Sequence, residues 1–228
     1  MDAHIHMNML QLPMNTNHDV LTLAQWLSPS FPVGAFAYSH GLETVIQSGR
    51  IASADAVQDW LVDVLEFGSG RNDCILLRAA YACATIDQVE VVNRTAIAVS
   101  ASSERVLETT LQGNAFAQTT AAIGGNDPVT VCYPVAVGYA AWCQRLDVDL
   151  TTALYLHAFA SNLVSVAVRA VPLGQTEGQR VLTNLLPLCQ KIAQDTQKAT
   201  LDDLSSTAFL SDISAMQHET LQPRIFRS

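Results

Sequence analysis

The residues best suited to chemistry in this sequence are its histidines. Ser39 and His40 are adjacent in the segment WLSPSFPVGAFAYSHGLE, residues 26–43, and suggest a nucleophile beside a base. Adjacent side chains on a helix point about 100° apart, however, and no carboxylate can be assigned to orient His40. His157 lies in an apolar stretch, where a hydrogen-bonded core histidine is expected. We therefore predict no catalytic residue and keep a small all-α hydrolase or lyase using His40 or His157 as the alternative.

Three further histidines, His4, His6 and His18, could bind a divalent transition metal, because imidazole suits zinc and nickel. A flexible polar segment would lose entropy on closing such a site. The five cysteines include no CxxC pair and imply no disulfide framework, which fits the reduced thiols of a cytoplasmic protein. We predict no metal ligand and no cofactor, and a direct carrier of such a metal using these three histidines is a competing hypothesis.

Familiar catalytic motifs are missing from the sequence. It contains no GxxxxGK[ST], no GxSxG and no HExxH. Its 12 Lys and Arg against 21 Asp and Glu give a net charge of −9, which argues against a nucleic-acid partner. These features favour a protein that binds other proteins over an enzyme.

The elements that must position these residues are helical. Residues 54–67 place Val57, Trp60, Leu61 and Val64 on one stripe, with Ser53 as N-cap. No alternating strand pattern persists, so the sequence predicts one all-α domain of eight to ten helices. The expected helices cover residues 54–67, 72–85, 87–98, 103–123, 132–146, 150–170, 175–197 with a kink at Pro187, and 207–219.

Three regions are expected along the chain. Residues 1–19 are polar and aperiodic and are predicted to form a flexible tail. Residues 20–221 form the helical domain, and residues 222–228 form a partner-binding tail. Within the domain, the prolines of residues 26–43 are expected to end one helix, and a helix is expected to restart near Phe36.

The middle of the chain carries few charges. Residues 128–144 and 150–168 contain no Asp, Glu, Lys or Arg. Both runs are rich in Ala, Ser and Thr, so we predict buried helices and no membrane span. Such helices can lie in the core or in the interface of a homodimer, and both readings stay open.

The two ends of the domain have the composition of interaction segments. Residues 26–43 combine aromatic side chains with rigid turns, which suits either a structural hinge or a docking surface. The last residues, MQHETLQPRIFRS, place Arg224 and Arg227 around Ile225 and Phe226, which suits either a protein-binding anchor or a frayed end.

Taken together, these segments resemble the urease accessory protein UreF family. Residues 26–43 resemble its W-L-S-P-x-F-P-[VI]-G-x-[FY]-x-[YF]-S-x-G-L-E pattern, and the last residues its M-x-H-E-x-x-x-x-R-[LI]-F-x-S pattern. Residues 173–179, LGQTEGQ, are similar to its L-G-Q-x-x-G-Q. Gln217 and Pro223 depart from many relatives, and residues 1–19 lie outside the match.

The resemblance implies a cytoplasmic, all-helical scaffold that dimerises and is not an enzyme. Such proteins bind an accessory protein called UreD or UreH, and the pair recruits the nickel-carrying GTPase UreG to apo-urease. The assembly acts as a chaperone for nickel insertion and metallocentre assembly.

The resemblance also implies site residues. By motif position Arg224 corresponds to an arginine implicated in GTPase recruitment, and Tyr38 belongs to the same docking region. We expect the partner-binding residues to be Tyr38, His40, Glu43, Arg224, Phe226 and Arg227. Deleting residues 222–228 is expected to leave the fold intact and to abolish recruitment.

Overall fold

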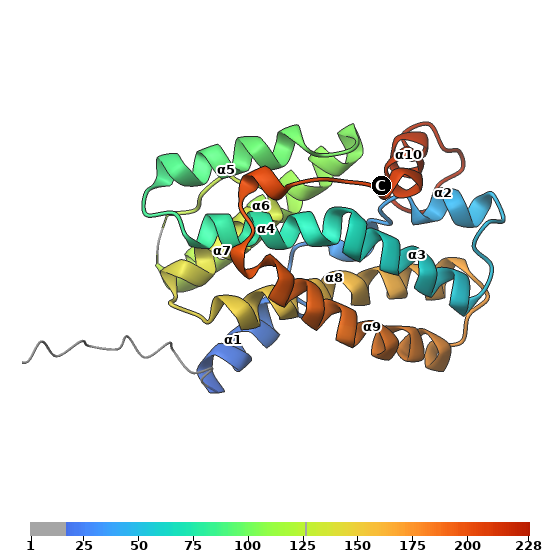
Figure 1. Ribbon diagram of the computed structural model, residues 1–228, viewed down its shortest axis with the longest axis horizontal. Coiled ribbons are helices and arrows are strands. Elements are labelled where there is room, and N and C mark those ends of the chain that lie inside the picture. The colour runs from blue at the N-terminus through green and yellow to red at the C-terminus, as the bar shows by residue number, and fades with distance from the viewer. Residues whose placement is uncertain (1–16, 126) are drawn as a thin grey trace, which may run out of the picture.

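The computed structural model describes residues 17–125 and 127–228, which fold into ten α-helices and three short 3-10 helices without a β-strand (Figure 1). The predicted all-α domain is therefore confirmed. The helices are α1 (Asn17–Trp26), α2 (Leu42–Gln47), α3 (Ala54–Phe67), α4 (Ser69–Tyr81), α5 (Ile86–Ala98), α6 (Ser103–Gly124), α7 (Tyr133–Cys143), α8 (Val148–Ala170), α9 (Gln175–Asp195) and α10 (Phe209–His218), with 3-10 helices η1 (Ala35–Ala37), η2 (Thr196–Lys198) and η3 (Leu201–Asp203).

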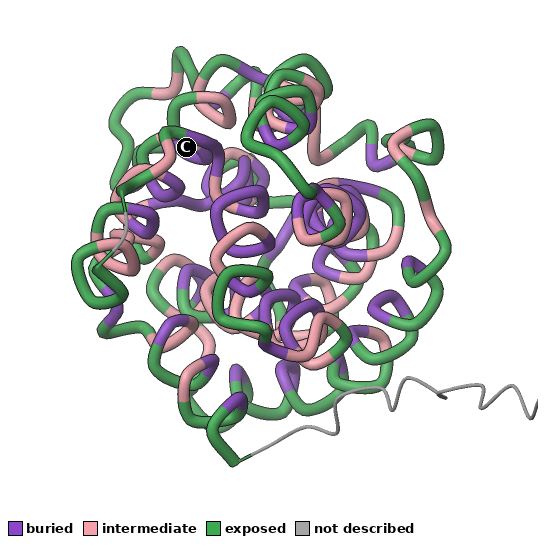
Figure 2. The backbone as a smooth tube through the Cα atoms, turned by 90° about the vertical axis from the view of Figure 1, so that its left-hand side faces the viewer, coloured by how far each residue is buried: buried purple, intermediate pink, exposed green. Residues whose placement is uncertain are grey.

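Two clusters of buried apolar side chains form the core. One is built mainly by α3, α8 and α9, and the other by α4, α6 and α7 with α1. Neighbouring residues of α8, Tyr155 and Leu156, belong to different clusters, so α8 connects them. Buried positions recur along most helices between exposed ones, as amphipathic packing requires (Figure 2).

The helix α8 is the one described helix whose length and composition would allow it to cross a membrane. Half of its most apolar stretch is buried within the fold. It packs against α9, α4 and α3. The apolar character of α8 is thus used for packing between helices, as expected for a core helix.

Several helix boundaries follow the local sequence signals, but the helix expected over residues 72–85 spans Ser69–Tyr81 as α4. The Ser53 hydroxyl accepts a hydrogen bond from Ala56 N at 3.2 Å, which confirms the predicted N-cap of α3. The helix α9 is a single helix with Pro187 inside it, on the exposed side.

The prediction of a helix restarting near Phe36 was wrong. Only the 3-10 turn η1 forms there, and α2 begins at Leu42. The cause is backbone geometry, since Tyr38 is extended while His40 and Gly41 have φ angles of 53° and 77°. A Cβ at Gly41 would lie 2.6 Å from the backbone nitrogen of Ala215, so glycine lets α10 approach α2 closely.

The expected 1–19 tail is only partly described. The helix α1 begins at Asn17, and Asp19 within it is buried and accepts a hydrogen bond from Asp147 N at 3.2 Å. His18 is exposed on this helix. His4 and His6 lie outside the described residues.

Candidate functional site

The end of the chain returns to the segment that precedes α2 (Figure 1). We call residues 222–228 the tail. Arg227 N donates to Ala37 O at 2.8 Å, and Ser39 N donates to Ser228 O at 2.6 Å. The Ser39 hydroxyl also donates to Ser228 O. Segments almost 190 residues apart in sequence are thus joined by backbone hydrogen bonds.

Glu43, in the first turn of α2, organises the middle of the tail. Its carboxylate is buried and accepts from Ile225 N at 2.7 Å and from Phe226 N at 2.9 Å. His218 Nε2 of α10 lies 3.0 Å from its Oε2. Burial alone would raise the pKa of Glu43, but the hydrogen bonds from His218 and from the two tail amides outweigh it and lower the pKa.

His218 links Glu43 to a second carboxylate. Its side chain is fully buried, and its Nδ1 lies 2.7 Å from Glu104 Oε2 at the start of α6. The other oxygen of Glu104 pairs with the guanidinium of Arg224 in the tail. Helices α2, α6 and α10 therefore meet the tail in one set of charged hydrogen bonds.

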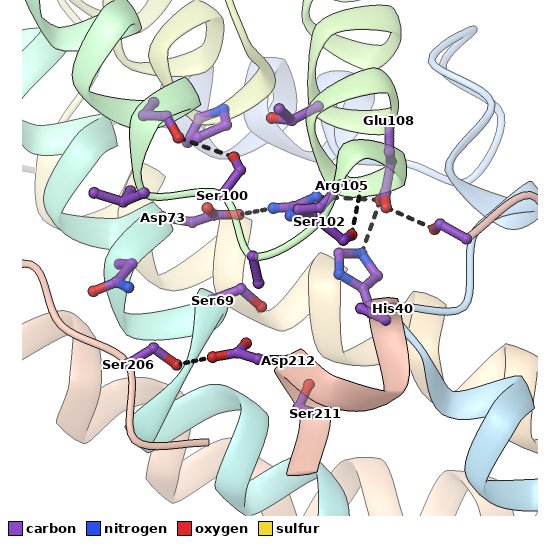
Figure 3. Close-up of a pocket in the computed structure, with 18 of the residues that line it drawn as sticks. His40, Ser69, Asp73, Ser100, Ser102, Arg105, Glu108, Ser206, Ser211 and Asp212 are labelled. Atoms are coloured by element: carbon purple, nitrogen blue, oxygen red, sulfur yellow. Dashed lines mark hydrogen bonds and ion pairs between the residues drawn. The ribbon is translucent and has the colours of Figure 1, made fainter. Parts of the chain in front are cut away.

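Glu108, one turn further along α6, holds the last residue. Its carboxylate accepts from Ser228 Oγ at 2.9 Å and from Gln112 Nε2 at 3.0 Å, and His40 Nε2 lies 2.8 Å from it (Figure 3). Burial would raise the pKa of Glu108, but the charges of His40 and Arg105 and the hydrogen bonds from His40 and Ser228 lower it to about 2. This carboxylate is therefore ionised at neutral pH.

The network continues to the centre of the molecule through Arg105. Its guanidinium lies 3.3 Å from Glu108 and 2.9 Å from Asp73 of α4 (Figure 3). Asp73 also accepts from the Tyr155 hydroxyl of α8 at 2.8 Å. A cavity of about 70 Å³ borders these groups and is lined by several serines. Buried polar contacts thus connect the tail to Tyr155 in one core cluster, and Phe226 of the tail packs in the other.

The outer side of the tail is exposed. Phe226 is buried beneath the Arg169 guanidinium, 4.7 Å from its ring centroid, and Ile225 points outward with 79% of its surface exposed. Phe36 is 64% exposed, and Arg169 Nη2 donates to its carbonyl at 2.8 Å. We call the exposed set the docking face; it consists of Phe36, Arg224, Ile225 and Arg227.

All six residues expected to bind partners lie in this region. Tyr38, His40, Glu43 and Phe226 are buried, whereas Arg224 and Arg227 are exposed; their role in partner binding stays a prediction. Sequence reasoning missed the residues that join the two segments, which are Glu104, Glu108 and His218. His218 stands in the MQHE motif, so its position in that motif was the available signal.

Ser39 and His40, the pair considered for catalysis, are each engaged by other groups. The Ser39 hydroxyl is bonded to Ser228 O and lies 3.3 Å from Glu43 N, and His40 is engaged by Glu108. His157 is half-buried and lines a second cavity, of about 380 Å³. His40 also lines this cavity. Within residues 17–125 and 127–228, no group of three or more His, Cys, Asp or Glu side chains is arranged to hold a metal.

Comparison with known proteins agrees with this picture. The UreF family model matches residues 51–186. The urease accessory protein UreF of Ruegeria pomeroyi is 52% identical over 93% of this chain and 98% of its own. That of Roseobacter denitrificans is 54% identical over 91% of this chain and 93% of its own, and one from Cereibacter sphaeroides is 50% identical over 92% and 98%. The chain therefore belongs to the UreF family of urease accessory proteins.

Proposed function

We propose that this chain is a scaffold in urease maturation, which binds a UreD- or UreH-type accessory protein and recruits a UreG-type GTPase to apo-urease for nickel insertion. The observation that carries the proposal is the convergence of the two sequence segments that resemble the family. The two segments form one site, whose inner side is buried and hydrogen-bonded and whose outer side is the docking face. On a chain of net charge −9, this face presents two arginines beside apolar side chains, which suits recognition of a protein surface.

The six residues divide into two roles in this proposal. Arg224 and Arg227 contact the partner. Glu43 and the buried Phe226 fix the position of the tail, and Tyr38 and His40 are buried in the segment to which the tail is bonded, so that the arginines are presented without a large ordering cost. The chain acts through binding, with no reaction, metal or cofactor of its own, and works in the cytoplasm.

A homodimer is part of the proposal. The charge-poor middle of the chain leaves apolar side chains on the surface, including Ile123 at 65% exposure and Trp142 at 42%. Trp142 stacks on Tyr139, with 5.9 Å between ring centroids, which forms a flat aromatic surface on α7. Burial of such groups against a second copy would stabilise a dimer.

Substitution of Arg227 tests the docking face directly. Arg227→Ala removes an exposed charge, so affinity for the partner proteins should fall about tenfold, as for an arginine near the centre of an interface. Arg180→Ala, on the exposed side of α9, is the matched control. Titration calorimetry measures both variants, and equal affinity of Arg227→Ala and wild type would contradict the docking role.

Deletion of the whole tail is a less informative test than expected from the sequence. Phe226 is only 3% exposed and Ser228 4% exposed, so the deletion would uncover the core. It would also leave Glu43 without its two backbone donors. Loss of recruitment after deletion could then follow from instability.

A further inference from the structure

We propose that Asn162 and Arg169 of α8 are positioning residues for Phe36, the aromatic anchor of the docking face. They hold the backbone of the 3-10 turn η1, so that the Phe36 ring stands out from the surface in one orientation. The support of the turn is a property of the chain itself. Its consequence for partners rests on the proposed function, because Phe36 belongs to the docking face.

The turn η1 has little support from apolar packing. None of its three residues is buried, and Phe36 is 64% exposed. Ala35 and Phe36 also line the cavity of about 380 Å³, so open space lies beside the turn. The position of η1 is therefore decided by its hydrogen bonds.

Each of the three backbone carbonyls of η1 accepts a hydrogen bond from a distant part of the chain. Ala35 O accepts from Asn162 Nδ2 at 2.9 Å, and Phe36 O accepts from Arg169 Nη2 at 2.8 Å. The third carbonyl accepts from Arg227 N of the tail at 2.8 Å. Three successive peptide units are thus held from outside the turn, two of them by side chains of α8.

The two side-chain donors lie on one face of α8. Asn162, Ser165 and Arg169 follow one another at spacings of three and four residues, which places them on the same side of the helix. Arg169 Nε donates to Ser165 O at 3.1 Å, one turn back along α8, and its guanidinium lies 4.7 Å from the centre of the Phe226 ring. A lysine could not make all these contacts, because its ammonium lacks the flat fork of donors.

An exposed aromatic ring binds a partner more tightly when its backbone is fixed beforehand. A mobile turn would lose conformational entropy on binding, whereas a turn that α8 already holds has lost that entropy on folding. Aromatic side chains are also enriched among the few residues that dominate the energy of an interface. Phe36 is the aromatic member of the docking face, so fixing η1 fixes the residue with most to contribute.

Asn162→Asp tests the support of the turn in the isolated chain. The substitution keeps the shape of the side chain but replaces the donor to Ala35 O with an acceptor, so two oxygens would face each other. Asn184→Asp, the same change at an exposed position of α9, is the matched control.

Nitrogen-15 relaxation measures the result. The backbone order parameters of residues 35–37 should fall from about 0.85 to below about 0.6 in Asn162→Asp and stay unchanged in Asn184→Asp. A turn as rigid in Asn162→Asp as in wild type would overturn the positioning role.

The effect on partners is measured by titration calorimetry with a UreD- or UreH-type protein and a UreG-type GTPase. Phe36→Ala should weaken binding about tenfold, as for an aromatic residue that anchors an interface. Asn162→Asp and Arg169→Lys should each weaken it about threefold or more, because each removes a hydrogen bond that holds the turn. Arg180→Lys, on the exposed side of α9, should bind like wild type.

A double-mutant cycle separates positioning from direct contact with the partner. If Asn162 acts through Phe36, Asn162→Asp should change the affinity little once Phe36→Ala is present. Losses of affinity that multiply in the double variant would show that the two residues act independently, and would overturn the positioning role.

The same measurements keep this inference apart from the proposed function. Binding that is weakened by Arg227→Ala but unchanged by Phe36→Ala would overturn the role of Phe36 as an anchor and leave the scaffold role standing. A chain that binds neither protein would contradict the scaffold role. The rigidity of η1 is measured without any partner, so the support from α8 is tested in either case.

Discussion

Glu43 and Glu108 hold the tail at two separate points. Glu43 accepts from two backbone amides in its middle, and Glu108 accepts from the hydroxyl of its last residue, Ser228. Each carboxylate is buried, and each faces a histidine, His218 and His40 respectively. A buried carboxylate with charged and backbone donors stabilises one conformation strongly, because loss of a donor leaves an unpaired charge.

Glu43→Gln should lower the free energy of unfolding by about 3 kcal/mol, because it removes one charge of a buried ion pair and replaces an acceptor with a donor. Glu90→Gln, on the exposed side of α5, is the control and should change it little. Urea unfolding monitored by circular dichroism measures both. Equal stability of the Glu43 variant and wild type would show that this carboxylate does not hold the tail.

The same carboxylates predict a loss of stability in acid. The pKa values of Glu43 and Glu108 are lowered in the folded protein, that of Glu108 to about 2 from its ordinary 4.5. The unfolded chain therefore binds protons first, and the stabilisation is lost as pH falls from above 4.5 toward 2.

Glu108→Gln should flatten this acid dependence relative to wild type. The free energy of unfolding, determined with urea at several pH values, measures the slope. An unchanged slope between pH 4.5 and 2 would contradict the assignment of the acid response to Glu108.

At the scale of elements, close helix packing depends on particular small residues. Gly138 of α7 faces the carbonyl of Leu77 on α4, and a Cβ there would lie 2.1 Å from that oxygen. The two helices pair extensively in one core cluster. The α4–α7 contact therefore has no room for a side chain at this position.

Gly138→Ala should destabilise the protein by about 1–3 kcal/mol, because the helices must separate to admit the methyl group. Gly174→Ala is a matched control, since a Cβ there meets only the flexible end of Glu177 at 3.5 Å. Thermal unfolding compares the two. A Gly138 variant as stable as the control would mean that the helices shift at little cost.

A helix could be predicted from the sequence wherever apolar residues recurred on one helical face and a capping residue stood at the start of the same stretch. Residues 54–67 match α3, and its N-cap is the predicted Ser53. The region near Phe36 could not be predicted, because the left-handed conformation of His40 is unusual for a residue other than glycine. It is stabilised by contacts with α6 that lie far away in sequence.

The site was predictable only in part for the same reason. The motifs identified Glu43 and the tail, but acidic residues are ordinarily exposed, so burial of Glu43 and Glu108 does not follow from composition. Their pairing with His218 and Ser228 joins residues more than 100 positions apart. Such pairing is fixed by the tertiary packing of α2, α6 and α10.

At the scale of the whole molecule, an acidic helical domain carries the docking face, which combines two arginines with apolar side chains. The interior is a packed core crossed by polar contacts that run from Glu43 through Ser39, Ser228, Glu108 and Arg105 to Asp73. Family membership is established by the comparisons, and the docking face is where we expect that role to be carried out. We propose that this molecule assembles its partner proteins into one complex.

Light scattering after size exclusion tests that claim most directly. The chain is examined alone, with a UreD- or UreH-type protein, and with that protein plus nucleotide-loaded GTPase; Arg227→Ala and Arg180→Ala are run in parallel. The account predicts a discrete complex containing all components, formed by wild type and Arg180→Ala and weakened in Arg227→Ala. A chain that elutes unchanged beside both partners would contradict it.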